Sequence, residues 1–249
     1  MAISHIASDW ELDLLTPDPG GTDNLIASKP GGTAEDDVMI MVATGSADQN
    51  GSPYTFSINT PSGWTRIDDL NYNSFISNYY QHQTAIFRKV AGSSEPSTYN
   101  VPYYGTPGWG TATITGVVTV STFRGVDPND PIGDDENQTN TATTNHTAPS
   151  INVSKANNWV VHCVSIMDNV AVTPPGGSPT YTERVEGPNS IGLGVNAELS
   201  SAVYTSSGAT GTKTATTGTS EVGHAFHIEL NQIPPELTME LIDYVYYDV

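Results

Sequence analysis

Residues 158–168 read Asn-Trp-Val-Val-His-Cys-Val-Ser-Ile-Met-Asp, and this stretch decides the fold class. Side chains alternate between two faces along an extended strand. Both faces of this stretch are mostly apolar, which predicts a strand buried between two layers. One face would carry Trp159, Val161, Cys163 and Met167, and the other Val160, His162, Val164 and Ile166.

Short segments of this kind recur from residue 38 onward, separated by Gly, Pro, Asn and Asp. In segment 111–124, Thr alternates with Ile114, Val118 and Val120, which predicts a strand with one exposed face. About eleven such segments without a strong helical pattern predict an all-β fold, a two-sheet β-sandwich of the jelly-roll type. The expected strands are 38–44, 54–59, 79–90, 97–103, 111–124, 149–154, 158–168, 180–186, 195–204, 210–217 and 222–230.

The sequence predicts one central domain with two extensions. Residues 1–30 are expected to form an irregular N-terminal extension, because prolines and glycines interrupt them. Residues 31–231 are expected to form the β-sandwich domain. Within it, residues 125–148 indicate a long surface connection between sheets, since almost nothing apolar follows Ile132. Residues 232–249 are expected to form a C-terminal interaction arm.

This arm begins where Pro234-Pro235 ends the last strand and stiffens the exit of the chain. Its composition is unusually apolar and aromatic, and a free tail of this kind would expose a surface that folded proteins usually avoid. We expect it to pack on a neighbouring subunit, on a shell or on its own domain, for example as a strand added to a sheet edge. Helical and extended periodicities both fit it. The residues expected to bind the partner are Leu237, Met239, Leu241, Ile242, Tyr244, Val245, Tyr246 and Tyr247.

The 249-residue chain is strongly acidic, with 27 Asp and Glu against 8 Lys and Arg, a formal net charge of −19. So few cations cannot replace the counterions of nucleic-acid phosphates or bind an anionic membrane, which excludes both partners. The longest apolar run, residues 38–43, is far shorter than the roughly 20 residues of a spanning helix. The start of the chain lacks the features of a signal peptide, which predicts synthesis in the cytosol. A basic protein, a neutral glycan or a cation remains as the kind of partner.

The sequence predicts no catalytic residue, metal ligand or cofactor site. His224 and His227 are three residues apart in a strand, so they should point to opposite faces of a half-exposed strand and cannot share a metal. His162 is expected to be hydrogen-bonded and partly buried, and Cys163 to be a buried, inert thiol. As the single cysteine, Cys163 cannot form an intrachain disulfide.

Two further groups of residues have the composition of ligand sites. Asp127, Asp130 and 134–136 offer the oxygen ligands that Ca²⁺ prefers, but their spacing fits no EF-hand, and a solvated acidic loop is the favoured interpretation. Aromatic side chains can stack on sugars, although most of them fill a core or its rim, so glycan binding stays an open alternative. The aromatic groups are Tyr99, Tyr103, Tyr104 and Trp109, and Tyr72, Phe75, Tyr79 and Tyr80.

Large aromatic and cationic side chains are expected to anchor the fold. Trp64 and Trp159 each begin an apolar segment, so they should lie in or beside the core. Arg88 and Arg124 are rare cations in an acidic chain, so they should pair with carboxylates.

A series of motifs runs in order through about residues 25–231. The motifs are Lys29-Pro30, Asp37-Val38-Met39-Ile40-Met41, Pro61-Ser62-Gly63-Trp64-Thr65, Phe87-Arg88, Glu95-Pro96, Phe123-Arg124-Gly125-Val126-Asp127, Pro131-Ile132, Thr182-Glu183-Arg184, Gly208-Ala209-Thr210-Gly211 and Ile228-Glu229-Leu230. This series resembles a group of β-sandwich domains found in tailed-bacteriophage virion proteins and in some bacterial surface proteins. Asp36 stands where that group usually has Gly, so a tight turn is less expected at this position.

The resemblance implies a structural module and supplies no catalytic residues. We therefore expect a non-enzymatic bacteriophage virion protein, most directly a capsid decoration (cement) protein on the outer surface of a virion assembled in the host cytoplasm. Its expected partners are the major capsid protein or another virion protein, and further copies of itself as a homotrimer. The alternative is a tail or fibre module that recognises a host-surface glycan, and a virion hydrolase is least favoured.

Overall fold

The computed structural model describes residues 1–48, 55–74, 80–106, 113–187 and 194–234. Strands make up 65% of the described residues, and the described ranges contain no helix. Nothing in these ranges therefore has the helical length and apolarity needed to cross a membrane. Several antiparallel sheets pack face to face, which confirms the predicted all-β sandwich.

The first half of the described chain forms a jelly roll. Five strands form a sheet of order β1-β8-β3-β6-β5, and three form a facing sheet of order β2-β7-β4. The pairs β1–β8, β2–β7 and β3–β6 are antiparallel, as expected when one long antiparallel ribbon is rolled into two sheets. The strands are β1 (Ser4–Leu15), β2 (Thr22–Ser28), β3 (Val38–Asp48), β4 (Phe56–Ile58), β5 (Thr65–Ser74), β6 (Tyr80–Val90), β7 (Thr98–Gly105) and β8 (Ile114–Arg124).

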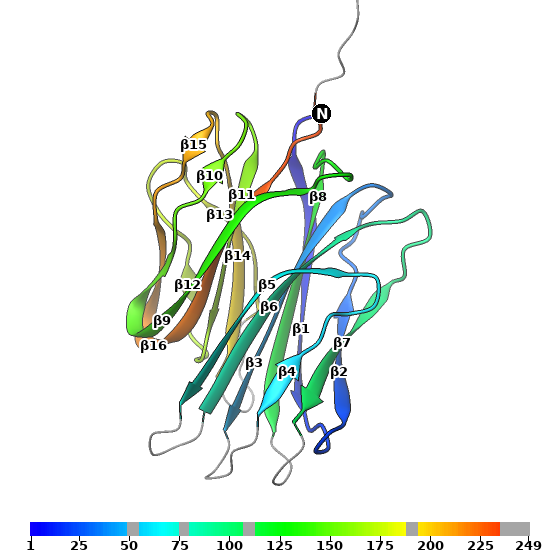
Figure 1. Ribbon diagram of the computed structural model, residues 1–249, viewed down its shortest axis with the longest axis vertical. Coiled ribbons are helices and arrows are strands. Elements are labelled where there is room, and N and C mark those ends of the chain that lie inside the picture. Colours follow the sequence, from blue (N-terminus) through cyan, green and yellow to red (C-terminus); the bar gives the residue numbers. More distant parts are fainter. Residues whose placement is uncertain (49–54, 75–79, 107–112, 188–193, 235–249) are drawn as a thin grey trace, which may run out of the picture.

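The second half forms another antiparallel sheet, of order β12-β16-β11-β14-β13 with β9 paired to β16. We call it the second sheet. It lies beside the five-stranded sheet of the jelly roll, with the short pair β10–β15 at one end (Figure 1). Its strands are β9 (Ile132–Ala148), β10 (Asn152–Val153), β11 (Trp159–Ile166), β12 (Val172–Thr173), β13 (Thr182–Gly187), β14 (Asn196–Val203), β15 (Gly208–Ala209) and β16 (Lys213–Leu230).

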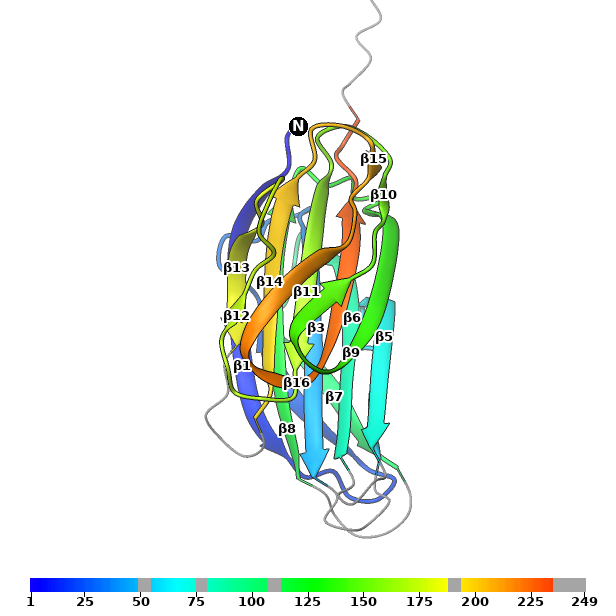
Figure 2. The same ribbon diagram turned by 90° about the vertical axis from the view of Figure 1, so that its left-hand side faces the viewer.

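The long strands β9 and β16 form a ribbon that folds over the outer face of the second sheet. The register between them shifts around Glu221, where the ribbon bends. Beyond the bend, residues 223–230 pair with β11 inside the sheet. Before it, β16 pairs with β12 and crosses the outer face (Figure 2). We call this crossing part, residues 213–217 with its β9 and β12 partners, the cover.

Alternation along β3 explains how three sheets share two main cores. Met39 and Met41 belong to the core between the two jelly-roll sheets. Their neighbours Val38, Ile40 and Val42 face the other way and pack against the second sheet. A strand that is apolar on both faces therefore becomes the central layer of the stack.

The two predicted core tryptophans occupy different cores. Trp64 is 6% exposed and meets the ring of Tyr99 edge-on, with 5.0 Å between the ring centroids. Trp159 is half-buried beside the core under the second sheet, where it meets the ring of Phe123 at 6.1 Å.

Two regions predicted to be irregular are strands. Residues 4–15 and 22–28 are integral jelly-roll strands, and Pro17, Pro19, Gly20 and Gly21 lie in the turn between them. Residues 132–148 form β9 along most of β16 and not a surface connection. Both β1 and β9 are edge strands with polar exposed faces, so they lack the apolar alternation that marks central strands. The sandwich also has a third large sheet layer, where two were predicted.

Candidate functional site

The predicted partner-binding residues of the C-terminal arm, Leu237 to Tyr247, lie outside the described residues. The residues that lead into the arm, Gln232 and Ile233, form backbone contacts with the domain, and we call them the root of the arm. Gln232 forms a β-bridge with Val126, and the Ile233 N–H donates to the Gly125 carbonyl at 3.0 Å. The root therefore lies beside the end of β8, at the same end of the molecule as the N-terminus (Figures 1 and 2).

A shallow recess of about 250 Å³ lies at this end. Trp159 forms part of its wall, and the Arg184 guanidinium lies 5.3 Å from the centre of the Trp159 ring. Val203, another wall residue, is 39% exposed, which is high for a large apolar side chain. The remaining wall residues are Ala2, Ile3, Asn157 and Gln232. We call this feature the terminal recess.

The loops around the terminal recess are tied together by Glu229, which is fully buried. One of its carboxylate oxygens accepts hydrogen bonds from the Ser154 N–H (2.6 Å), the Ser154 hydroxyl (2.8 Å) and the Asn158 side-chain amide (2.6 Å). The other accepts the Asp134 N–H at 3.1 Å. A buried carboxylate with four donors is stable, because hydrogen bonds replace its hydration. In the sequence, Glu229 stands out only as part of the Ile228-Glu229-Leu230 motif, although a Glu between two apolar residues of a buried strand is a recognisable signal of a buried carboxylate.

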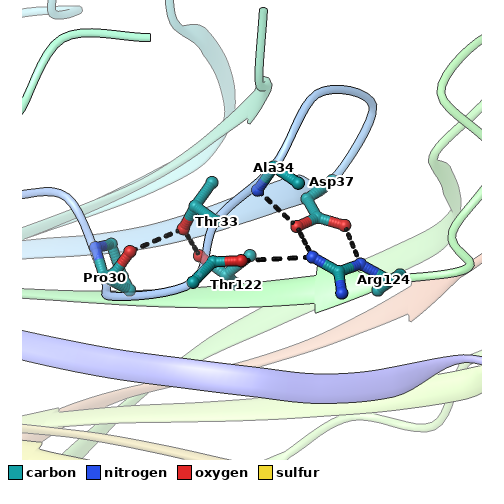
Figure 3. A network of polar contacts seen from close by, with 7 residues as sticks. Pro30, Thr33, Ala34, Asp37, Thr122 and Arg124 are labelled. Carbon is teal, nitrogen blue, oxygen red and sulfur yellow. Dashed lines mark hydrogen bonds and ion pairs between the residues drawn. The ribbon is translucent and has the colours of Figure 1, made fainter. Parts of the chain in front are cut away.

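A second anchor joins the loop before β3 to the end of β8. Arg124 donates two hydrogen bonds of 2.8 Å, from Nε and Nη2, to the carboxylate of Asp37, which is 2% exposed (Figure 3). The same carboxylate accepts the Ala34 N–H at 2.8 Å. The prediction that Arg124 pairs with a carboxylate is confirmed. For Arg88, no ion pair occurs among the described residues.

Asp36 takes the tight-turn position in this loop. Its φ is 65°, in the left-handed region that Gly usually occupies and Asp tolerates better than most residues. The turn therefore forms without the Gly that the resemblance implies.

We expect Asp37→Ala to lower the free energy of unfolding by about 2–3 kcal/mol, because it removes an acceptor of charged and backbone hydrogen bonds in a buried position. Urea denaturation followed by circular dichroism measures the change. Glu35→Ala is the matched control, since Glu35 is exposed in the same loop. Equal midpoints for the two variants would show that the Asp37 contacts contribute nothing.

Two buried histidines face each other between the jelly roll and the second sheet. The rings of His82 on β6 and His224 on β16 lie 4.7 Å apart. His82 bonds through Nδ1 to the Ser46 hydroxyl (2.9 Å) and through Nε2 to the Ser165 hydroxyl (3.0 Å). His224 bonds through Nδ1 to the Thr84 hydroxyl at 3.0 Å. Burial lowers the pKa of His82 to about 4 and that of His224 well below its usual value.

A second pair lies on the outer face of the second sheet, under the cover. His162 and His227 are directly opposite on β11 and β16, with 5.2 Å between their rings. His227 Nδ1 lies 2.8 Å from the Pro149 carbonyl, which can only accept, so this nitrogen carries the proton. Nε2 is then free to accept from the Tyr181 hydroxyl at 3.3 Å, as in a neutral imidazole. Burial lowers the pKa of His227 to about 4.

These positions test the sequence predictions for the histidines. His224 and His227 do point to opposite faces, as predicted, but their strand is buried rather than half-exposed. His162 is fully buried, so its predicted partial burial is wrong, and its ring nitrogens have no side-chain hydrogen-bond partner. Cys163 is buried as predicted, and burial raises the pKa of its thiol well above the usual value.

The hydroxyl–imidazole contacts do not make a usable nucleophile. Ser165 lies at hydrogen-bond distance from His82, but the other nitrogen of His82 meets a serine hydroxyl and not a carboxylate. Both side chains are fully buried, so a substrate cannot reach them. These contacts instead supply the buried polar groups of two packed sheets with partners.

The acidic side chains of residues 127–136 accept hydrogen bonds from backbone N–H groups near them in the fold. Asp127 accepts the Asn129 N–H at 3.0 Å, and Asp134 accepts the Asn152 N–H at 2.7 Å. Burial, and then the charges of neighbouring carboxylates, raise the pKa of Asp135. Across the described ranges, no three His, Cys, Asp or Glu side chains are arranged to hold a metal.

The predicted aromatic groups are partly core. Tyr99 and Tyr103 are buried, and the Tyr103 hydroxyl donates to the Thr44 carbonyl at 2.8 Å. Tyr72, Tyr80 and Tyr104 are half-buried. Trp109, Phe75 and Tyr79 lie outside the described residues. The exposed indole in the described part is instead Trp10, on the edge strand β1, at 41%.

Comparison with family models, curated proteins and solved structures found no match. The motifs of the chain and the features at its terminal recess therefore indicate its function.

Proposed function

We propose that this chain is a non-enzymatic structural protein of a tailed-bacteriophage virion, and that it decorates the outer surface of the capsid. The proposal combines the motif resemblance over residues 25–231 with one feature of the fold. The root of the C-terminal segment, the N-terminus and the terminal recess lie together at one end of a stack of sheets. A rigid body with its attachment elements gathered at one end suits a protein that clamps a shell.

The surface charge supports the same proposal. A chain with a net charge of −19 is attracted to a basic shell surface and repelled from nucleic acid. The major capsid protein is therefore the partner we propose, with another virion protein as the alternative. We propose further that the bound form is a homotrimer, because decoration proteins of the kind that the motifs resemble commonly occupy threefold positions.

Binding to shells tests the proposal directly. The purified chain is mixed with capsids stripped of surface proteins, and the bound fraction is measured by cosedimentation at low and high salt. We expect saturable binding at a fixed number of copies per shell, weakened by salt because the attraction is electrostatic. Binding to a glycan array without binding to capsids would favour a tail or fibre module, and turnover of peptidoglycan or nitrophenyl glycosides would favour an enzyme.

Removing residues 235–249 tests the role of the C-terminal segment. A chain that ends at Pro234 keeps every described contact, including the bond from Ile233 to Gly125. We therefore expect an unchanged melting temperature with strongly reduced capsid binding, because the apolar attachment residues are missing.

A full-length chain in which Tyr244, Tyr246 and Tyr247 are replaced by serine is the matched control for chain length. It should also bind weakly if aromatic contacts carry the attachment. A truncated chain that unfolds, or that binds capsids as the full chain does, would contradict the assignment of the arm.

A further inference from the structure

Five of the six histidines in the chain are fully buried, and all five lie in or against the second sheet. The remaining one, His5, is half-buried on the edge strand β1. The buried ones form two layers. The inner layer, His82 and His224, lies between the jelly roll and the second sheet, and the outer layer lies between the second sheet and the cover. The outer layer consists of His146, His162 and His227.

Among the described residues, no carboxylate forms a hydrogen bond or an ion pair with either ring of the inner layer. The groups that face His82 and His224 from the other elements are the hydroxyls of Ser46, Thr84 and Ser165. His82 faces His224 and lowers the pKa of that histidine further after burial, and His146 does the same for His82. Protonating either ring would place a cation between two packed sheets.

The outer layer also lacks a paired carboxylate. Lys213 and the Tyr181 hydroxyl face this layer from the cover and the loop before β13. His146 packs against Gly223 and lies near the Thr217 hydroxyl.

The acidic groups around this layer are Glu198 on β14, Glu183 and Glu186 on β13, and Glu136 opposite His227 on β9. Glu198 is fully buried with both oxygens unpartnered, and burial raises the pKa of its carboxyl well above the usual value. A neutral Glu198 cannot compensate a charge on His162. Glu136 is exposed and outside the layer.

The core inside the jelly roll is built differently. Its described residues include no histidine. The polar side chains at its edge, Gln81 and Gln83, bond to the backbone of Phe56 and Ile58 on β4, and glutamine does not titrate. The titratable side chains of this core, Tyr99 and Tyr103, stay protonated in acid, because burial raises their pKa. Acid therefore acts on the histidines around the second sheet rather than on the jelly-roll core.

We propose that the second sheet is joined to the jelly roll and to its cover by acid-sensitive seams, so that mild acid opens these seams before it unfolds the jelly roll. The chain then has one state at neutral pH, with all layers closed, and a second state in acid, in which the second sheet is loosened.

The direction and the pH window follow from proton linkage. A histidine with a pKa near 6.5 when exposed and about 4 when buried binds a proton only after the seam opens. The closed state is therefore fully favoured above about pH 6.5 and loses stability as the pH falls towards 4. Each such histidine raises the opening constant by up to about tenfold per pH unit. The carboxyls whose pKa burial raises, Glu198 above all and also Glu183 and Glu221, act in the opposite direction.

Cys163 reports the opening of the inner seam. It is the single cysteine, it is fully buried, and it belongs to the core between the second sheet and the jelly roll. Its reaction with a dipyridyl disulfide, corrected for pH with the urea-unfolded chain, should accelerate at least about a hundredfold between pH 7 and pH 5. Hydrogen exchange followed by mass spectrometry should show β2 and β7 still protected at pH 5. A thiol that stays protected, or protection lost in β2, β7 and the thiol together, would overturn the proposal.

Replacing one buried histidine distinguishes the effect of protonating the seam histidines from other effects of acid on the protein. His162→Phe removes a titrating ring that has no side-chain hydrogen bond to lose in the structure. We expect the backbone hydrogen exchange of residues 213–217, the β16 part of the cover, to be at least about fivefold slower at pH 5 than in the parent chain. His5→Gln is the control outside the seams and should stay within about twofold of the parent. Equal rates for the parent chain and His162→Phe at pH 5 would contradict the role of the outer seam. If this variant does not fold, the Cys163 reaction and the hydrogen exchange of the unsubstituted chain decide the proposal.

Discussion

Replacing Trp64 with alanine is expected to lower the free energy of unfolding by about 3–5 kcal/mol, the usual cost of a large cavity in a packed core. Trp64 follows a turn in which its own N–H bonds to the Pro61 carbonyl at 3.1 Å, and Gly63 supplies the left-handed φ of 77° that this turn needs. The turn directs the indole into the core between the jelly-roll sheets, against Tyr99. The neighbouring side chains are fixed on two sheets, so they cannot move in to fill the cavity that the indole leaves.

Urea denaturation followed by circular dichroism measures this effect. Trp10→Ala is the matched control, because Trp10 is 41% exposed on an edge strand and its loss should cost less than about 1 kcal/mol. Trp159, which is half-buried, should give an intermediate value. If Trp64→Ala and Trp10→Ala unfold at the same urea concentration, Trp64 does not have the core position described above.

Replacing Glu229 with alanine is expected to cost about 3–5 kcal/mol, for a different reason. The substitution leaves the backbone N–H groups of Asp134 and Ser154 and the Asn158 amide without their acceptor in a buried site. Each of these donors belongs to a different loop or strand end near the terminal recess. The loops should therefore loosen together, and the loss should exceed that of a single hydrogen bond.

Glu229→Gln separates the acceptor from the charge. One amide oxygen can still accept from Ser154 and Asn158, while the amide nitrogen meets the Asp134 N–H as a second donor, so an intermediate loss is expected. Glu136→Ala is the control for removing a carboxylate, because Glu136 is exposed on the neighbouring strand β9. In thermal denaturation, we expect the melting temperature to fall most for Glu229→Ala, less for Glu229→Gln and least for Glu136→Ala. An alanine variant as stable as the Glu136 control would show that the Glu229 network contributes nothing.

Apolar alternation predicts the central strands well and the edge strands poorly. The central strands β3, β8 and β11 lie within a few residues of their expected ranges. The exposed face predicted for segment 111–124 is wrong over β8, because this strand is buried on both faces and its Thr115, Thr119 and Ser121 side chains are covered as well. The edge strand β1 contains Asp9, Glu11 and Asp13, and β9 is rich in Asn and Thr, so neither has the pattern of a buried strand. Backbone pairing with β8 and β16 makes them strands in spite of their composition.

Local sequence cannot predict the buried polar groups, because their partners are distant along the chain. His82 and Ser165 are 83 residues apart and meet only when two sheets stack. The three-residue spacing of His224 and His227 does predict their opposite faces, since it depends on strand geometry alone. Their burial depends on the jelly roll on one side and on the cover on the other, which no local pattern contains.

Imaging of virions tests the central claim, that this chain is a decoration protein of the capsid surface, most directly. Virions of a phage that encodes the chain are incubated with gold-labelled antibodies against the purified protein and examined by electron microscopy. We expect gold over the whole capsid surface, at regular positions, and none on the tail. Gold confined to the tail or its fibres, or intact virions without label, would contradict it.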